Sequence, residues 1–290
     1  YRQAEKALTT FLYTLPNHIQ PVTGRLHPHY RQTGAYSGRM SCGNPNIQQI
    51  PREKEFRECF TAPKGKKMVI ADYSQIELRV IAQYTKDKRM MEAYKNGEDL
   101  HRLTASLIGQ KPLETISKSE RQAAKAVNFG LVFGMGAAGL QAYAAETYGT
   151  TMSIEEAEIF KRRFFEGYIG VAQWHSRIKK TLPGVSRTLS GRKHVYGKES
   201  GLSGRFNTPI QGTAADILKN ALGILYKELQ GTDAKIVAVI HDEIILECPE
   251  DVSEEMAVLL REVMESAGDR YLKDVPVLVE VSVSDSWAGK

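Results

Sequence analysis

The chain alternates short apolar runs with longer stretches in which apolar and charged positions interleave. The apolar runs at residues 67–71, 236–240 and 244–247 have the length and the β-branched content of buried strands. The longer stretches have the mixed pattern of helices that bury one side. Together these patterns predict an α+β fold. Helices are predicted over about 75–96, 155–182, 211–229 and 253–272, a helical region over 100–152, a hairpin over 187–196 and a last strand over 277–283.

The first 51 residues follow a different pattern. Residues 1 to about 15 have the pattern of the end of a helix, which Leu15-Pro16-Asn17 is expected to stop. The segment from Gly24 to Pro51 is rich in Gly, Pro, Asn and Ser. It is predicted to be irregular and to lie on the surface, with short strands.

Acidic residues stand where two of the apolar runs end. Asp72 follows the first run, and His241-Asp242-Glu243 lies between the other two, which indicates strand, tight turn, strand. If the strands are neighbours, Asp72 and Asp242 face one point in space. Two hard oxygen ligands with open coordination positions suit Mg²⁺ completed by substrate phosphates, as in two-metal phosphoryl transfer. A single Asp after a strand is more often a turn or capping residue, and the matching context of the two favours the metal.

The stretch 119–134 is Ala-rich and predicts a helix. Arg121, Lys125 and Phe129 recur every fourth residue and therefore share one face, while Ala124, Val127 and Leu131 occupy another. A triphosphate would meet the Arg as a fork and the Lys as a point charge, and a base or sugar would lie against the ring. Taken singly, the two cations indicate a solvated helix face and the Phe a core residue.

These stretches resemble the motifs of the DNA polymerase I family, the family A DNA polymerases. Residues 72–79 resemble motif A, 121–134 resemble motif B on the fingers helix, and 241–243 resemble motif C. Further similar stretches, in the order of the family, are 38–41, 46–51, 99–102 and 207–216.

The resemblance implies a right-hand polymerase palm with an antiparallel sheet and a largely helical fingers subdomain. It implies that 1–20 are the end of the thumb, 21–85 the first part of the palm, 86–200 the fingers and 201–290 the second part of the palm. The chain has no room for the rest of a thumb or for an exonuclease domain. We therefore expect a fragment of a longer polypeptide or an unusually minimal polymerase, with a weak grip on duplex DNA.

The activity that the resemblance implies is primer extension by two-metal phosphoryl transfer with release of pyrophosphate. The implied partners are primer-template DNA and deoxynucleoside triphosphates, and the implied cofactor is a pair of Mg²⁺ ions, with Mn²⁺ as a substitute. The implied metal ligands are Asp72, Asp242 and the backbone carbonyl of Tyr73. The implied catalytic residues are Asp72, Asp242, Lys125 and Arg121, with Lys125 as the proton donor to pyrophosphate. The implied nucleotide-binding residues are Arg121, Lys125, Phe129, Phe133, His101, Gln75 and Glu77.

Sugar selection also follows from the resemblance. Glu77 matches the steric gate that excludes a 2′ hydroxyl, and Phe129 matches a position where Phe resists dideoxynucleotides. Phe133 departs from the family, which usually has Tyr there, so the hydroxyl that would hydrogen-bond Glu77 is missing.

Duplex contacts are implied at a further set of positions. Arg39, Asn207 and Gln211 match residues that read the minor groove, where the acceptors are common to all base pairs. His241 and Glu243 flank the metal aspartate, with His241 near the primer terminus. Ser203 stands where relatives usually have Arg. Without the motif, residues 207–211 would be read as a helix start with Asn207 or Thr208 as its cap.

Other functions remain open alternatives. A metal-dependent nuclease or phosphohydrolase would use similar aspartates but has no reason for the Arg-Lys-Phe face. A non-catalytic nucleic-acid-binding remnant would be expected to have lost Asp72, Asp242 or Lys125. A single-subunit RNA polymerase shares this kind of palm, but Glu77 favours deoxynucleotides.

Composition adds little to this interpretation. Lys and Arg number 39 against 34 Asp and Glu, a net charge of +5 that is compatible with a polyanionic partner. The 3 cysteines have no metal-type spacing and favour a reducing compartment, such as a bacterial cytoplasm, a phage-infected cell or an organelle interior. The sequence contains no signal-peptide pattern and no apolar run of membrane-spanning length, so no membrane partner is expected. Trp174 and Trp287 are expected to be packing residues.

Overall fold

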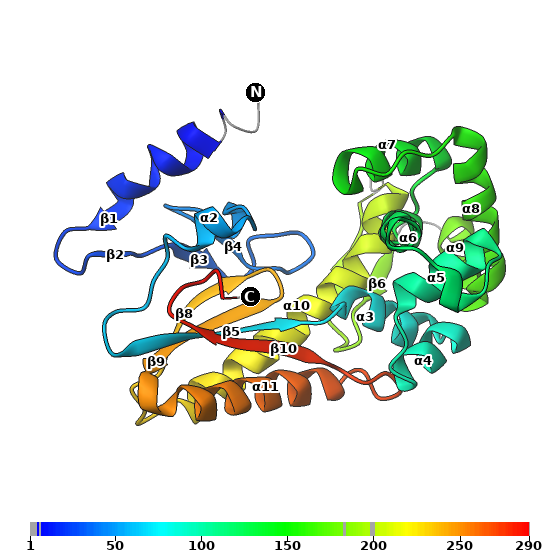
Figure 1. Ribbon diagram of the computed structural model, residues 1–290. Helices are drawn as coiled ribbons and strands as arrows, with labels where there is room; N and C mark the ends of the chain where they lie inside the picture. The colour runs from blue at the N-terminus through cyan, green and yellow to red at the C-terminus, as the bar shows by residue number, and fades with distance from the viewer. Residues whose placement is uncertain (1–4, 6, 182–183, 198–200, 290) are drawn as a thin grey trace. The chain divides into compact units, whose positions relative to one another are not determined.

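The structure is a computed structural model that describes residues 5, 7–181, 184–197 and 201–289. The chain forms two compact units (Figure 1). The sheet unit comprises Tyr1–Ser74, Ala215–Gly268 and Leu278–Lys290, and the helical unit comprises Gln75–Ala214 and Asp269–Val277. The mixed fold with an antiparallel sheet is the predicted α+β class.

The sheet unit is built on a 4-stranded antiparallel sheet with the strand order β10-β5-β9-β8. Its strands confirm the three predicted apolar runs and the last predicted strand, with shifts of a few residues at their ends. β5 continues through Asp72 and Tyr73, so the acidic residue lies inside the strand rather than after it. The bounds are β5 (Lys66–Tyr73), β8 (Lys235–Ile240), β9 (Glu243–Pro249) and β10 (Val279–Ser284).

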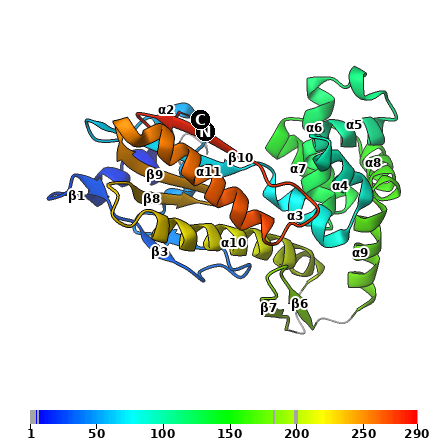
Figure 2. The ribbon, with the colours of Figure 1, turned by 90° about the horizontal axis from the view of Figure 1, so that it is seen from below.

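Side chains of β5 alternate between the two faces of the sheet. Met68 and Ile70 belong to a buried apolar cluster on one face, together with Trp287. Tyr73 has the opposite parity, and its hydroxyl donates to the carbonyl of Met264 in α11 (Ser253–Asp269) at 2.7 Å. Both ribbon views show α11 lying along the sheet (Figures 1 and 2). Because both faces are covered, the central strands are apolar throughout rather than alternating. The helix ends at Asp269, before the predicted Leu272.

The N-terminal part of the sheet unit is irregular, as predicted for Gly24 to Pro51. Cys42, Ile47 and Ile50 are nevertheless buried in the apolar cluster, so the segment covers the sheet instead of lying only on the surface. A helical segment does end before the predicted stop at Leu15-Pro16-Asn17, since η1 ends at Leu12, but Pro16 itself lies at the start of a 3-10 helix, where its missing N–H is tolerated. The part of that prediction that falls on residues 1–4 and 6 lies outside the described residues. The elements are η1 (Ala7–Leu12), η2 (Leu15–His18), β1 (Ile19–Gln20), β2 (Arg25–Leu26), β3 (His29–Arg31), β4 (Ser41–Gly43), η3 (Ile47–Gln49), α2 (Lys54–Arg57) and, before α11, η5 (Glu250–Val252).

The helical unit confirms the predicted helical region and hairpin. Its α6 (Lys118–Val132) packs against α5, α7 and α8 (Figure 1). The hairpin turns at Gly191, which has a φ of 87°. The other elements are α3 (Ile76–Thr85), α4 (Lys88–Lys95), α5 (Leu100–Gly109), η4 (Leu113–Thr115), α7 (Ala137–Tyr148), α8 (Ile154–Gly167), α9 (Ile169–Lys180), β6 (Val185–Arg187) and β7 (Lys193–Val195).

Two predicted helices are each broken in two. The helix predicted over 75–96 is α3 and α4, separated at Lys86, which has a φ of 53°. The helix predicted over 155–182 is α8 and α9, separated at Tyr168, and Leu182 lies outside the described residues. One side chain caps a new helix start at both breaks: the carboxylate of Asp87 accepts from the N–H of Met90 at 3.1 Å and from that of Gly170 at 2.8 Å.

The helix predicted over 211–229 is longer than expected. α10 runs over Leu202–Glu228 and includes Pro209 in its interior. The interpretation of Asn207 or Thr208 as a helix cap is therefore wrong, because both lie inside the helix. The hydroxyl of Thr213 donates to the carbonyl of Pro209 at 2.7 Å, one of the local bonds around this proline.

Candidate active site

Two carboxylates lie side by side at one end of the sheet. Asp72 is near the end of β5, and Asp242 is in the two-residue turn that joins β8 to β9. In the register of the sheet Asp72 faces Glu243, and the N–H of Tyr73 donates to the carbonyl of Asp242 at 3.3 Å. The structure thus brings together the two aspartates that the sequence pairs.

The electrostatics of Asp242 reflect this arrangement. Burial raises the pKa of Asp242, Arg39 lowers it, and the negative charge of Asp72 raises it again, so that the net pKa is above the usual range. Two neighbouring carboxylates of which one is partly desolvated favour a bound cation, because a cation removes their mutual repulsion.

Arg39 supplies one cation to this site. Its Nη2 lies 3.4 Å from Oδ1 of Asp242, and both side chains are about a quarter exposed. Nζ of Lys219 donates to the carbonyl of the preceding Gly38 at 2.6 Å, which ties the loop to α10. The sequence contains no local signal for the pairing of Arg39 with Asp242, since the two residues are far apart in the chain.

The turn residue His241 is exposed and has a φ of 55°, the left-handed conformation that two-residue hairpin turns require. Partial desolvation and then Arg39 lower the pKa of His241, which favours the neutral imidazole. Its predicted position near a primer terminus stays a prediction.

The side chain of Glu243 is buried and is held by partners within the sheet unit. It is 5% exposed, and its Oε1 accepts from Nε1 of Trp287 at 2.6 Å. Its Oε2 lies 3.5 Å from Nη1 of Arg57, whose guanidinium also lies over the Trp287 ring. A direct contact of Glu243 with DNA would require these bonds to open. Trp287 is 2% exposed, which confirms it as a packing residue.

The donor set fits a hard divalent cation. Among the described residues no group of three or more His, Cys, Asp and Glu side chains is arranged to hold a metal ion. Asp72 and Asp242 supply two hard carboxylate donors, the donor type of Mg²⁺ sites that substrate phosphates and water complete. The Tyr73 side chain points to α11, so only its backbone is available at this end of the sheet.

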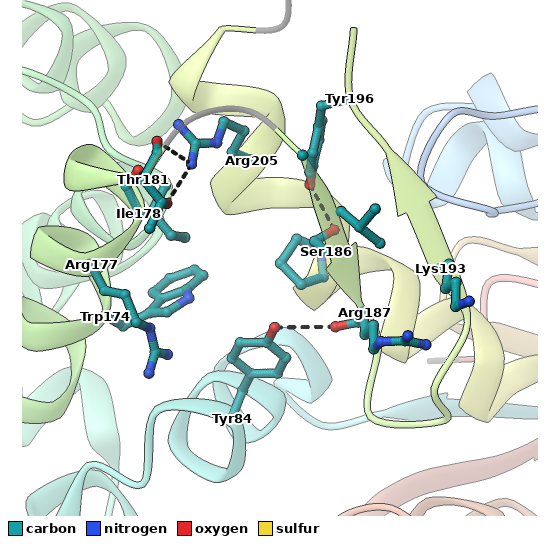
Figure 3. A pocket seen from close by; sticks show the side chains of 13 residues that line it. Tyr84, Trp174, Arg177, Ile178, Thr181, Ser186, Arg187, Lys193, Tyr196 and Arg205 are labelled. Carbon is teal, nitrogen blue, oxygen red and sulfur yellow. Dashed lines mark hydrogen bonds between the residues drawn. The ribbon is translucent and has the colours of Figure 1, made fainter.

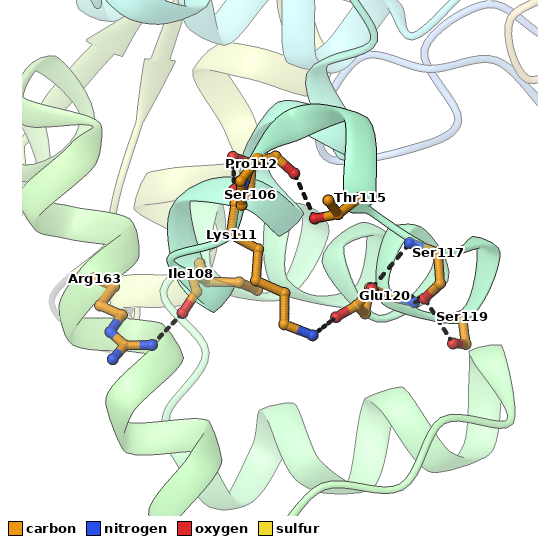
Figure 4. A network of polar contacts seen from close by, with 9 residues as sticks. All are labelled: Ser106, Ile108, Lys111, Pro112, Thr115, Ser117, Ser119, Glu120 and Arg163. Atoms are coloured by element: carbon orange, nitrogen blue, oxygen red, sulfur yellow. Dashed lines mark hydrogen bonds and ion pairs between the residues drawn. The ribbon is translucent and has the colours of Figure 1, made fainter.

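α6, the helix that carries Arg121, Lys125 and Phe129, begins at a capping box (Figure 4). Oγ of Ser117 accepts from the N–H of Glu120 at 3.2 Å, and Glu120 accepts in return from the N–H of Ser117 at 2.9 Å. An ion pair with Lys111 and these bonds lower the pKa of Glu120 to about 2. The start of α6 is thus set by its own sequence and by the loop before it.

The predicted division of α6 into two faces is confirmed. Ala124, Val127 and Leu131 are fully buried. Arg121, Lys125 and Phe129 are partly exposed, and Nε of Arg121 is paired with Oδ2 of Asp99. This ion pair orients the guanidinium at the exposed face.

His101 is held by a buried polar network. It is 3% exposed, and burial lowers its pKa to about 4, so it is neutral at pH 7. Nδ2 of Asn128 lies 2.9 Å from its Nδ1, while Oδ1 of Asn128 accepts from Thr104 at 2.9 Å. This amide orientation makes Nδ1 the acceptor and puts the imidazole proton on Nε2. Sequence reasoning missed Asn128, although a polar residue on the buried face of an Ala-rich helix was a signal.

The remaining predicted nucleotide residues lie at helix ends of the helical unit. Gln75 precedes α3 with a φ of 54°, and its Oε1 accepts from the hydroxyl of Tyr94 at 3.2 Å. Glu77 is in the first turn of α3, and Phe133 is the C-cap of α6. Both are partly exposed.

The predicted DNA residues of α10 are also partly exposed. Nδ2 of Asn207 donates to Oγ of Ser203 at 3.2 Å, and Gln211 lies one turn further on. Arg205, the arginine nearest to the altered position Ser203, is 9% exposed and bonds to Thr181. It therefore has a structural role at the end of α9.

A carboxylate pair at one end of a sheet, in a chain that also has a helix presenting Arg, Lys and Phe, is typical of proteins that transfer phosphoryl groups of nucleotides. The chain belongs to DNA polymerase family A, whose family model matches residues 1–289.

Curated relatives agree with this assignment. DNA polymerase I of Aquifex aeolicus (strain VF5) is 43% identical over 288 residues, which cover 97% of this chain and 49% of that protein. The thermostable DNA polymerase I of Thermus aquaticus is 37% identical over 305 residues, which cover 99% of this chain and 35% of that protein. The chain thus spans half or less of the length of these relatives.

A solved structure is also similar. This structure is the POL domain of Pol1 from M. smegmatis in complex with DNA primer-template and dNTP, and it matches the chain with a TM-score of 0.89 at 32% identity. The match covers 99% of this chain and 52% of that one. No helix in the described part of the chain is both long and apolar enough to cross a membrane.

Proposed function

We propose that the chain carries out template-directed DNA synthesis as a DNA-directed DNA polymerase. The observation that carries this function is the pairing of Asp72 in β5 with Asp242 in the adjoining β8–β9 turn, with the raised pKa of Asp242. Membership of family A supports the reaction, and the primer-template and dNTP of the M. smegmatis structure support the partners.

In the proposed reaction the primer 3′ hydroxyl attacks the α-phosphorus of a deoxynucleoside triphosphate. A new P–O bond forms at the α-phosphorus, the bond from that phosphorus to the oxygen shared with the β-phosphate breaks, pyrophosphate leaves, and the hydroxyl proton is released to solvent. Members of the family are generally metal-dependent, and we propose two Mg²⁺ ions, replaceable by Mn²⁺, held by Asp72, Asp242 and the carbonyl of Tyr73. Such ions lower the pKa of the attacking hydroxyl and stabilise negative charge on the phosphoryl group.

The exposed face of α6 would bind the nucleotide. Arg121 would form a forked pair with phosphate oxygens, and Lys125 would give a proton to the departing pyrophosphate. His101 would donate from Nε2, in agreement with the Nδ1 bond to Asn128. Phe129 would lie against the sugar or base. Gln75, Glu77 and Phe133 complete the proposed nucleotide set.

Proposed duplex contacts come from Arg39, Asn207, Gln211 and His241, while Glu243 is included only if its bonds to Trp287 and Arg57 open. We also propose the names end of thumb, palm and fingers for the ranges 1–20, 21–85 with 201–290, and 86–200. The cysteines Cys42, Cys59 and Cys248 are unpaired, which supports the expectation of a reducing compartment such as the cytoplasm.

Primer extension with Asp72→Asn and Asp242→Ala tests this function. Each variant is expected to lose at least about a hundredfold in rate, since a bound metal ion contributes several kcal/mol at the transition state and a loss of about 2.7 kcal/mol is a hundredfold in rate. Asp285→Asn, at an aspartate whose side chain is 82% exposed, is the control and should extend normally. Unchanged circular dichroism would show that the fold persists. Near-normal extension by Asp242→Ala would refute the assignment, and release of nucleoside monophosphate in place of pyrophosphate would favour a nuclease.

A further inference from the structure

The helical unit contains a cavity of about 580 Å³ that none of the predicted site residues line (Figure 3). It lies between α3, α9, the β6–β7 hairpin and the first turns of α10. Its volume falls within the roughly 300–1,000 Å³ of ligand pockets. The lining that matters chemically is Tyr84, Trp174, Arg177, Arg187, Lys193 and Tyr196.

Aromatic rings from α3, α9 and the hairpin region line the cavity and are held in place. Trp174 is 3% exposed and meets Tyr84 edge to face at a centroid distance of 5.8 Å. The Tyr84 hydroxyl donates to the carbonyl of Arg187 at 3.1 Å, and the Tyr196 hydroxyl bonds to Ser186 at 2.8 Å. The rings are therefore preorganised, and Tyr84 is the one with partial exposure.

Cations gather at the same cavity without acidic partners. Arg177, Arg187 and Lys193 are exposed, and no ion pair among the described residues involves any of them. The lining contains no Asp or Glu. Arg205 also lines the cavity, but its Nη2 is bonded to Thr181.

Two of these cations lie in directly opposed positions on the two strands of the hairpin. Arg187 and Lys193 are direct partners across the β6–β7 hairpin, which Figure 3 shows side by side. Like charges in directly opposed positions destabilise a hairpin. A bound anion between them would offset this repulsion, so the pair marks where an anionic ligand would lie.

We propose that this cavity binds single-stranded nucleic acid, with one base against Tyr84 and the edge of Trp174, one phosphodiester at the Arg187–Lys193 pair and another at Arg177 on the opposite side of the cavity (Figure 3). Aromatic faces beside a cationic groove are the features that bind single strands without sequence preference. A simple phosphate would make no use of the rings, and a neutral ring compound would make no use of the cations. The bases of a duplex are stacked inside it and would not enter the cavity. Binding of this kind goes beyond the proposed reaction, since it needs neither metal ion nor triphosphate.

The first test is fluorescence anisotropy of a labelled oligothymidylate with the whole chain, in the absence of divalent metal and nucleotides. Arg187→Gln/Lys193→Gln is expected to weaken binding about tenfold at low salt and to reduce the slope of log K against log salt by about 1. The matched control is Lys161→Gln/Arg162→Gln on α8, which removes the same charge outside the cavity and should leave binding within about twofold of wild type. Thermal unfolding verifies that each variant is folded. Equal losses in both variants would overturn the proposed site.

A second test measures the fluorescence of a residue that lines the cavity, Trp174. The oligothymidylate is expected to quench the tryptophan fluorescence of the wild type, which contains Trp174 and Trp287. This quenching should be lost in Trp174→Phe, where Trp287 is the remaining tryptophan. An abasic oligonucleotide should bind several-fold more weakly, because it keeps the phosphates and lacks the base. Equal binding of the abasic strand, or quenching that persists in Trp174→Phe, would contradict stacking in this cavity. If thymidine monophosphate competes as well as the strand, the ligand is a free nucleotide and the single-strand proposal is wrong.

Discussion

Two buried histidines of the helical unit have their charge set by burial. His101 and His175 are each 3% exposed, and burial lowers the pKa of each to about 4. Nε2 of His175 lies 2.7 Å from the carbonyl of Val132, and its ring stacks on Phe206 at 4.1 Å between centroids. Both side chains are therefore neutral in the folded protein at pH 7.

These shifts predict a loss of stability in acid. Above the unfolded pKa of 6.5 neither state takes up a proton, whereas between 6.5 and about 4 the unfolded chain is protonated and the folded one is not. The free energy of unfolding should therefore fall as the pH drops from 6.5 to about 4, by up to about 3 kcal/mol for each histidine. Urea denaturation across this range would measure it. His175→Gln should flatten the dependence, and parallel curves for variant and wild type would contradict the explanation.

The partly exposed face of α6 carries a second residue-scale prediction, which rests on the proposed function. Phe129→Tyr is expected to raise incorporation of dideoxynucleotides relative to deoxynucleotides, because a phenol would stand in for the missing 3′ hydroxyl. Glu77→Ala, at the gate position, should instead raise incorporation of ribonucleotides. The measurement is the terminator and ribonucleotide ratio in primer extension. Unchanged ratios would count against the placement of both residues.

Among the elements, α6 has well-defined ends. It starts in the capping box of Ser117 and Glu120 and ends in a pair of backbone bonds, from Gly134 N to Leu131 O and from Met135 N to Gly130 O, both at 3.0 Å. These two bonds form a Schellman motif, which needs a left-handed residue after the cap. Gly134 has a φ of 84°, and a Cβ on it would lie 2.6 Å from the ring of Phe206.

Gly134→Ala is therefore expected to destabilise the protein by about 2–4 kcal/mol, from the left-handed conformation and from overpacking. Gly223→Ala in α10 is the matched control, since a Cβ there meets nothing within 4 Å. That substitution should be neutral or stabilising by up to about 1 kcal/mol. Chemical denaturation of both variants gives the comparison. Similar stabilities for the two would refute the role assigned to Gly134.

For the molecule as a whole, contacts between distant segments hold the N-terminal part onto the sheet. Arg25 of β2 forms a forked pair with Glu247 of β9 at 2.8 and 3.0 Å, and Lys66 adds a contact at 3.3 Å. Burial alone would raise the pKa of Glu247, but the bonds from Arg25 and Lys66 lower it overall. The hydroxyl of Tyr30 bonds to the backbone of Val239 at 3.1 Å in the same region.

Arg25→Ala is expected to destabilise the sheet unit by about 1–2 kcal/mol. This is less than the loss from a fully buried pair, because the Arg25 side chain is 44% exposed and Lys66 remains. Replacing both partners, in Arg25→Met/Glu247→Met, should cost less than the single change, since no buried carboxylate is left without its arginine. A double-mutant cycle in urea measures this coupling, and additive losses would contradict it.

Local sequence was enough to predict the strands, the two faces of α6 and the aspartate pair. The spacing of apolar residues and the length of an apolar run depend only on residues that are close in the chain. The strands β5, β8 and β9 could therefore be recognised as apolar runs with one end near Asp72 or Asp242. The breaks in the long helices were not visible in the same way. The start of α9 depends on a bond between the N–H of Gly170 and the side chain of Asp87, which are far apart in the chain.

The amino-acid sequence by itself determined the elements, the chemistry of the motifs and the family, because each depends on residue types at short and regular spacing. Only the tertiary structure decided which side chains meet. In the folded chain Asn128 hydrogen-bonds His101, and Trp287 hydrogen-bonds Glu243. Arg57 forms an ion pair with Glu243, and Arg39 forms one with Asp242. Only folding brings such partners together, and burial then sets their charge, so neither the partners nor the pKa shifts follow from spacing along the chain.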